Sequence, residues 1–210
     1  TILTRLAWGI PPCKTGIDTI PKTMEAGHVT ELIDRISRLV ANASLAEGLK
    51  PAQWEVLRYL AVANRFSRTP GTLALWLGST KGTVSQTINS LENRGLLLKT
   101  AAADRRSVHL SLTPKGEAIL SRDGLGRVRA SVAGMAGGDR ERLGALLESL
   151  LHRMIAANGG KSFGVCKTCR HFTVAPASSA KDASGRFCSL LKEVLSEQEA
   201  SQICVEQEAA

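Results

Sequence analysis

The chain has 210 residues, a formal net charge of +8 and a hydrophobic fraction of 43%. This composition is typical of a globular protein and excludes wholesale disorder, while the positive charge favours a polyanionic partner. No apolar run approaches the roughly 20 residues that a membrane-spanning helix needs, so no membrane partner is expected. The first residues lack the pattern of a secretory signal, which favours a cytoplasmic location with reduced thiols.

The chain divides into four parts by composition. Residues 1–22 hold three prolines and two glycines without helical periodicity, which predicts a mobile N-terminal arm. Residues 23–157 show helical periodicity over most of their length, and residues 158–165 form a Gly-rich linker. Residues 166–210 carry four of the five cysteines, so we expect them to form a separate small module.

Three helices are predicted in the first half of the helical part. Apolar residues recur at helical spacing over residues 29–43, which is typical of a long amphipathic helix. The next helix is expected to start at Pro51, because proline is favoured in a first helical turn. A short third helix over Thr72–Leu77 is expected to end at Gly78.

The fourth predicted helix, which Ser79 or Thr80 would cap, has two different faces. Val84, Ile88 and Leu91 are spaced i, i+4 and i+7 and must be buried. The other side is polar but almost uncharged, whereas a merely solvated helix usually carries pairs of Glu and Lys. Such side chains exchange hydrogen bonds with base edges, so we predict a DNA-reading surface, with a solvated helix as the alternative. The residues predicted to approach bases are Lys81, Thr83, Ser85, Gln86 and Asn89.

A two-stranded ribbon is predicted after this helix, with strands over residues 96–98 and 108–112. In the second strand Val108, Leu110 and Leu112 should point inward while His109 and Ser111 face out. The connection is too long for a tight turn and should project. It carries Asp104, Arg105 and Arg106.

Arginines at the ribbon tip and at the end of the fourth helix are candidates for backbone contacts. We expect Arg94, Arg105 and Arg106 to contact phosphate or the minor groove. Asp104 is expected to hold one of the tip arginines by a charge-assisted hydrogen bond. An ordinary pair of surface arginines is the alternative for the tip.

Residues 49–157 resemble the MarR family of winged helix-turn-helix repressors. The matching motifs are Leu49-Lys50-Pro51-Ala52-Gln53-Trp54, Thr83-Val84-Ser85, Leu91-Glu92-Asn93-Arg94-Gly95-Leu96, Asp104-Arg105-Arg106 and Leu112-Thr113-Pro114-Lys115-Gly116. The resemblance implies a fold that is mainly α with a small β-wing, in which the winged helix-turn-helix domain sits on a helical dimerisation stem. Residues 23–157 would form this DNA-binding and dimerisation domain.

The resemblance also implies a function and partners. A homodimer would bind a pseudo-palindromic double-stranded DNA operator and repress transcription until a signal, such as a small aromatic effector, releases it. The first and last two helices would form the dimer, the last two being residues 114–136 and 139–157. Gly124 and Gly126 should kink the former. The continuous apolar face of the latter is consistent with a dimer seam or with a buried helix.

The cysteine spacing predicts a metal centre. Cys166 and Cys169 form a C-x-x-C step, and Cys188 and Cys204 complete a four-sulfur set in the C-terminal module. A C-x-x-C step places two thiolates where one metal centre can take both. In a reducing compartment a disulfide is the less favoured use, and free structural thiols are the other alternative. We therefore predict a four-cysteine metal-binding module.

Zinc is the first expectation for the metal, because four thiolates suffice for a tetrahedral site. A [4Fe-4S] iron–sulfur cluster is the alternative, since the order of the cysteines resembles that of high-potential iron–sulfur proteins and nearby phenylalanines could shield a cluster. Ser196 and Glu199 form a predicted capping box, which should start a helix that continues through Cys204.

These observations favour a sequence-specific DNA-binding transcription regulator, a repressor by occupancy, over an enzyme. No Ser-His-Asp grouping, phosphate-cradling glycine loop or carboxylate pair stands out, and the chain has only four histidines. The metal centre would be structural or would sense redox state or metal. The alternative function is a protein-interaction module whose four-cysteine domain docks a partner.

Overall fold

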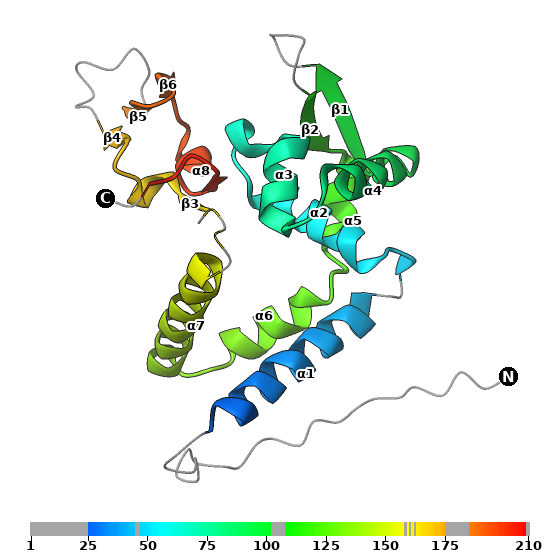
Figure 1. Cartoon of the computed structure of the whole chain (residues 1–210), viewed down its shortest axis with the longest axis vertical. Helices are drawn as coiled ribbons and strands as arrows, with labels where there is room; N and C mark the ends of the chain where they lie inside the picture. Colours follow the sequence, from blue (N-terminus) through cyan, green and yellow to red (C-terminus); the bar gives the residue numbers. More distant parts are fainter. Residues whose placement is uncertain are drawn as a thin grey trace, which may run out of the picture. The chain divides into compact units, whose positions relative to one another are not determined.

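The computed structural model describes residues 25–44, 47–101, 108–157, 159, 161, 163–174 and 185–208. By its contacts the chain divides into two units, with the boundary after Leu39. Figure 1 labels helices and strands of the described chain. The predicted N-terminal arm, residues 1–22, lies outside the described residues. Among the described helices none is long and apolar enough to cross a membrane.

Helices dominate the described chain. They are α1 (Ala26–Ser44), α2 (Pro51–Val62), the 3-10 helix η3 (Arg65–Ser67), α3 (Pro70–Leu77), α4 (Lys81–Asn93), α5 (Pro114–Leu120), α6 (Leu125–Ala133), α7 (Gly137–Ala157), the 3-10 helix η4 (Cys166–Thr168) and α8 (Glu197–Ala200). The first predicted helix, the short third helix and the helix over residues 139–157 are thus confirmed as α1, α3 and α7.

The strands form three small antiparallel sheets. They are β1 (Leu97–Ala101) with β2 (Val108–Leu112), β3 (Gly164–Val165) with β7 (Ile203–Cys204), and β4 (Phe172–Val174), β5 (Arg186–Cys188) and β6 (Glu193–Val194) in that order. The ribbon β1–β2 runs in register from the pair Leu97–Leu112 to the pair Ala101–Val108. The architecture is mainly α with a small β-ribbon directly after α4, as predicted.

Local capping explains where the helices around the turn between α3 and α4 begin and end. Thr69 caps α3, and Gly78 ends it in the left-handed conformation at φ +56°, which glycine adopts without strain. Thr80 caps α4 by accepting a hydrogen bond from the backbone N–H of Thr83 at 3.3 Å. The sequence prediction that Gly78 separates two helices is confirmed, and the cap is Thr80.

One hydrophobic core joins α2, α3, α4 and the ribbon into what we call the lobe, residues 47–120. Its buried members are Leu49, Trp54, Val56, Leu57, Tyr59, Leu60, Ala63, Leu73, Ala74, Val84, Ile88, Leu91, Leu96, Leu97 and Leu110. The three apolar residues predicted to be the buried side of α4 are all at most 1% exposed. Burial of this stripe fixes which face α4 presents outward.

The ribbon departs from the predicted alternation at one end. Leu110 is fully buried, but Val108 is 38% exposed, because its end of the ribbon extends beyond the core. His109 was expected to face solvent. Instead it is half-buried, and its Nε2 lies 2.7 Å from the carbonyl oxygen of Arg65, to which it donates. Strand β2 is therefore tied to η3 near the outer end of the ribbon.

The helix predicted over residues 114–136 is two helices, α5 and α6, separated near Gly124 as the glycines suggested. The junction is fixed by Asp123, whose carboxylate accepts hydrogen bonds from Arg58 Nε at 2.7 Å and Nη2 at 2.5 Å. Burial raises the pKa of Asp123, but the bonds from Arg58 and from Leu125 N–H outweigh it and hold the pKa below its ordinary value. The carboxylate thus ties α2 to the α5–α6 junction as an ion.

A close backbone approach explains the glycine in the motif Leu112–Gly116. Thr113 caps α5 by accepting from Gly116 N–H at 3.0 Å, while its hydroxyl donates to the Gly95 carbonyl at 2.7 Å. A Cβ at Gly116 would fall far inside van der Waals contact with the carbonyl oxygen of Leu96. Only glycine lets α5 lie this close to the end of α4.

We expect Gly116→Ala to lower the free energy of unfolding by about 1–3 kcal/mol, because the backbone must shift to admit the methyl group. Gly126→Ala, where a Cβ meets nothing within 4 Å, is the matched control and should be neutral or slightly stabilising. Urea unfolding of both variants measures the difference. Equal stabilities would contradict the close-approach explanation.

Candidate nucleic-acid interface and cysteine centre

The outward face of α4 carries the side chains predicted to read bases. Lys81, Thr83, Ser85, Gln86 and Asn89 are all exposed. Ser85, Gln86 and Asn89 lie opposite the buried stripe of the same helix, and Lys81 and Thr83 flank them. A continuous run of short hydrogen-bonding groups on an exposed helix suits the donors and acceptors of a major groove.

Neighbouring elements hold α4 rigidly from behind. Gln53 of α2 donates from Nε2 to the hydroxyl of Ser90 at 2.9 Å, while its own carbonyl oxygen accepts from the N–H of Lys50 at 2.8 Å. Gln53 is only 5% exposed. A buried amide that is satisfied on both sides fixes the helix's orientation and position relative to α2.

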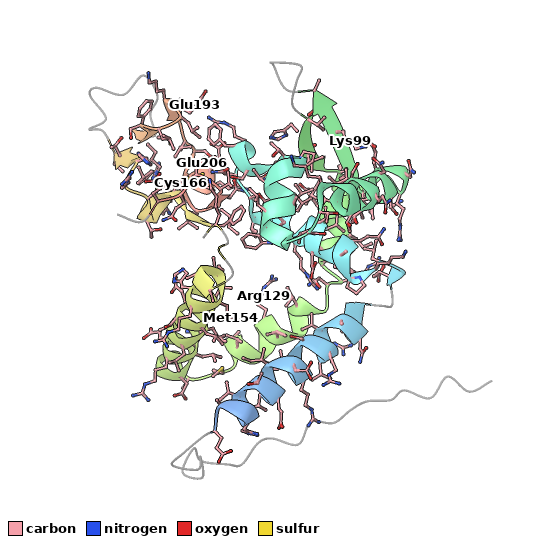
Figure 2. The ribbon with its side chains drawn as sticks, viewed as in Figure 1. Lys99, Arg129, Met154, Cys166, Glu193 and Glu206 are labelled. Atoms are coloured by element: carbon pink, nitrogen blue, oxygen red, sulfur yellow. The ribbon has the colours of Figure 1, made fainter. Side chains whose placement is uncertain are left out.

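Lys99 of β1 links the ribbon to α4, and sequence analysis did not single it out (Figure 2). Its ammonium lies 2.5 Å from Oδ1 of Asn89 and 2.6 Å from a carboxylate oxygen of Glu92. The amide oxygen of Asn89 is thus occupied by an intramolecular donor. Because Glu92 already pairs with it, Lys99 connects the ribbon to the predicted base-reading surface without adding net positive charge there.

Arg94 has a structural role that the sequence did not indicate. Its guanidinium donates to the carbonyl oxygens of Gly48 at 2.7 Å and Glu47 at 3.3 Å. These bonds tie the end of α4 to the segment before α2. A phosphate contact by Arg94 stays a prediction, and it would compete with these bonds.

The ribbon tip cannot be compared with its prediction. Asp104, Arg105 and Arg106 lie outside the described residues. Their expected contacts with phosphate or the minor groove, and the bond from Asp104 to an arginine, stay predictions from the sequence.

The structure brings all four C-terminal cysteines to one pocket. Cys166 begins η4, Cys169 follows it, Cys188 ends β5 and Cys204 ends β7. All four are free thiols. The pocket is lined by these cysteines together with His171, Phe172, Leu190, Leu195 and Glu206. Two of the lining residues, Cys166 and Glu206, are labelled in Figure 2.

The last cysteine is held differently from the prediction. The capping box of Ser196 and Glu199 is confirmed, but α8 ends at Ala200 and does not continue through Cys204. The reason is strand pairing, since Cys204 is registered opposite Gly164 in the β3–β7 sheet. A long-range pairing therefore overrides the local helix signal.

Two of the thiols are electrostatically coupled. A hydrogen bond from Cys166, helped by Asn64 and Ser67, lowers the pKa of Cys204 to about 6 against the effect of burial. The same bond and burial raise the pKa of Cys166. One of this pair is thus poised as a thiolate, which is the form that ligates metals. Within the described ranges, however, no three His, Cys, Asp or Glu groups are already spaced to hold a single ion.

The donors to these sulfurs come from the lobe. Asn64, directly after α2, donates from Nδ2 to Sγ of Cys166 at 3.6 Å, and its backbone N–H donates to Ile203 at 2.9 Å. The hydroxyl of Ser67 accepts from Val205 N–H at 2.9 Å. The cysteine segment is therefore hydrogen-bonded to the connection between α2 and α3. Sequence analysis missed this, because no periodicity or motif joins residues more than 100 positions apart.

Arg65 adds an ionic contact at the same connection. Its guanidinium lies 2.5 Å from Glu199 and 3.2 Å from Glu193, and it donates to the Val194 carbonyl at 2.9 Å. It also lies over the ring of Phe66 at 4.4 Å. The arginine thus bridges η3 to the strand and helix that follow Cys188.

Comparisons with known proteins support the fold of the lobe. Residues 47–107 match the model of the MarR family. CouR, a transcriptional repressor bound to a 23-mer DNA duplex, is 27% identical over 60% of this chain and 92% of its own, with a TM-score of 0.50. The MepR–DNA complex from S. aureus is 18% identical over 62% of this chain and 96% of the MepR chain, with a TM-score of 0.51.

A further similar structure is the MarR family transcription regulator SP03579, 20% identical over 63% of this chain and 89% of its own, with a TM-score of 0.51. No curated protein sequence matches the chain.

We expect Arg94→Ala to lower the free energy of unfolding by about 1 kcal/mol, because it removes hydrogen bonds to two backbone carbonyls. If the guanidinium keeps these bonds when DNA binds, the salt dependence of binding should not change. Urea unfolding and DNA titrations at several salt concentrations measure the two effects. A fall of about 1 in the slope of log K against log salt would assign Arg94 to phosphate instead.

Proposed function

We propose that this chain, whose residues 47–107 form a MarR-family winged-helix domain, is a DNA-binding transcription regulator that acts as a homodimer on a pseudo-palindromic operator. The family consists of transcription regulators and not of enzymes. The observation that carries the proposal is the exposed, polar and nearly uncharged face of α4, the second helix of a helix-turn-helix. The second helix is the one that enters the major groove in this architecture.

The contacts of this face define the mechanism of recognition. Ser85 and Gln86 would exchange hydrogen bonds with base edges, and Lys81 would supply positive charge beside them. Arg105 and Arg106 at the ribbon tip would contact phosphate or the minor groove. The bound repressor CouR is similar over most of its length, which favours repression by occupancy. A small aromatic molecule remains the expected releasing signal.

Exposed apolar surface supports the dimer. α7 carries Leu146, Leu147, Leu150, Leu151 and Met154, which are 37–70% exposed. α1 separately exposes Val29, Leu32, Ile33, Ile36 and Leu39. Long amphipathic helices with uncovered apolar stripes are stabilised when another copy of the chain covers them. We propose that these helices form the dimer interface.

We also propose that the four cysteines bind a metal, with zinc as the first candidate and a [4Fe-4S] cluster as the alternative. The convergence of all four on one pocket supports ligation, and the poised thiolate lowers the cost of deprotonation on binding. Phe172, Leu190 and Leu195 would shield either centre from water. Elemental analysis and the absorption spectrum of anaerobically purified protein distinguish the candidates, because only the cluster is coloured.

The second candidate function is a protein-interaction module in which the cysteine segment docks a partner. Its packing against the lobe argues for a role inside this chain, since Asn64, Arg65 and Ser67 already engage it. A partner that is retained by the wild type and lost when the cysteines are replaced, with DNA binding unaffected, would favour this alternative.

We expect Gln86→Ala to relax sequence specificity, because a good bidentate base contact is worth about 1–3 kcal/mol of discrimination. Its affinity for an operator selected from random duplexes should fall while its affinity for unrelated DNA is kept. Arg106→Ala is the contrasting variant and should weaken all sequences alike and flatten the salt dependence. Equal losses on operator and random duplex for Gln86→Ala would reject its base-reading role.

We expect Leu151→Glu to give a monomer, because it puts a charge in the apolar stripe of α7. Ser149→Glu adds the same charge to the opposite face and should stay dimeric. Operator affinity of the monomer should fall by about 100-fold or more, since one half-site no longer assists the other. Analytical ultracentrifugation and DNA titration measure both effects. A dimeric Leu151→Glu variant would remove α7 from the interface.

A further inference from the structure

Residues 63–68 connect α2 to α3, and we call this connection the corner. It contacts both the cysteine pocket and the elements that are predicted to bind DNA. On the cysteine side Asn64 donates to Sγ of Cys166, and Ser67 accepts from the backbone next to Cys204. Phe66 packs into the small hydrophobic cluster formed by Cys166, Leu195 and Cys204. The wall of the cysteine pocket therefore includes residues of the lobe.

The same corner holds the ribbon and the start of α3. The carbonyl of Arg65 accepts from His109, and the carbonyl of Arg68 accepts from Leu110 N–H at 2.7 Å. Thr69, the next residue, caps α3, which packs on α4. A displacement of the corner would thus be felt in strand β2 of the ribbon and in the helix behind α4.

Burial makes the corner depend on the cysteine segment. Asn64 and Ser67 are both 0% exposed. In the part of the chain that the structure describes, no buried side-chain nitrogen or oxygen lacks a hydrogen-bond partner. Withdrawing the cysteine segment would remove the partners that it supplies and open these groups to water, so the hydrogen bonds that hold the corner against the segment would be lost.

We infer that metal occupancy of the cysteine centre and operator affinity are linked through Asn64 and Ser67, with the metal-bound protein as the form that binds the operator more tightly. This inference rests on the proposed function. Filling the centre fixes Cys166 and Cys204, and through them the corner and the elements that present α4 and the ribbon. Since coupling between two sites is reciprocal, binding of operator DNA must then raise the affinity for the metal by the same factor by which the metal raises the affinity for the operator.

The first experiment compares metal-bound and metal-free protein. Zinc and iron contents are measured by elemental analysis before and after EDTA treatment under anaerobic conditions, and circular dichroism checks that the fold is kept. Operator affinity should fall by about 5–150-fold on metal loss and return when the metal found in the isolated protein is restored. Unchanged operator affinity in the folded metal-free protein would overturn the inference. So would isolated protein that binds the operator while holding neither zinc nor iron.

The second experiment removes the two polar side chains of the corner and keeps the cysteines. Asn64→Leu and Ser67→Ala should lose metal to EDTA more readily, by about 10–100-fold in apparent affinity, because groups that orient ligands tune metal binding. Gln53→Leu is the matched control. It removes another buried amide of the lobe, one that bonds Ser90 and not the cysteines, and should keep its metal. Equal metal loss from all three variants would show general destabilisation and contradict the inference.

The reciprocal measurement separates this inference from the proposed function. Saturating operator duplex should slow metal loss from the wild type, whereas a duplex of unrelated sequence should not. If the operator binds without changing the rate of metal loss, the proposed function as a regulator stands and the linkage is rejected. If no operator can be selected, the proposed function as a regulator is rejected. The comparison of the variants then tests only whether Asn64 and Ser67 support metal binding. If metal-free protein or Asn64→Leu does not fold, Ser67→Ala supplies the test.

Discussion

The buried polar corner between α2 and α3 is the constraint on which the rest of the described structure depends. A loop that turns inside a protein must satisfy its hydrogen-bonding groups, and Asn64 and Ser67 do so with groups more than 100 residues further along the chain. Asn64 uses its amide oxygen for Ser67 N–H, its amide nitrogen for Cys166 and its backbone N–H for Ile203. The winged-helix lobe and the cysteine segment therefore share hydrogen bonds that neither can replace alone.

This sharing changes how the C-terminal segment is understood. A small module with few large apolar residues rarely forms a stable core by itself. Here its core of Cys166, Leu195 and Cys204 is completed by Phe66 from the lobe, while Phe163 packs back into the lobe's own core against Tyr59 and Trp76. Packing in both directions, together with the ion pairs of Arg65, makes the segment a part of the lobe in the folded chain.

Local signals in the sequence were sufficient to predict the helices and the ribbon of the lobe. They were insufficient to predict its tertiary contacts. The stripe of Val84, Ile88 and Leu91 determined the orientation of α4, because helical periodicity acts within one element. The cysteine spacing indicated a common site, and the four residues do meet at one pocket. The helix expected through Cys204 was wrong, because pairing with Gly164 outweighs a capping box. The roles of Asn64, Lys99 and Arg94 depend on tertiary contacts that no local pattern encodes.

The metal centre that we propose for the four cysteines would give the corner a further physical role. Four thiolates around zinc, or around an oxidised [4Fe-4S] cluster, leave about two negative charges in a half-buried site. Such charge is costly to bury unless donors and cations lie beside it. The amide of Asn64 supplies a donor to Cys166, and the guanidinium of Arg65 lies in the same corner, paired with Glu193 and Glu199. Because the carbonyl of Arg65 also accepts from His109, a change in that proposed charge would act on a residue that already holds the ribbon in place.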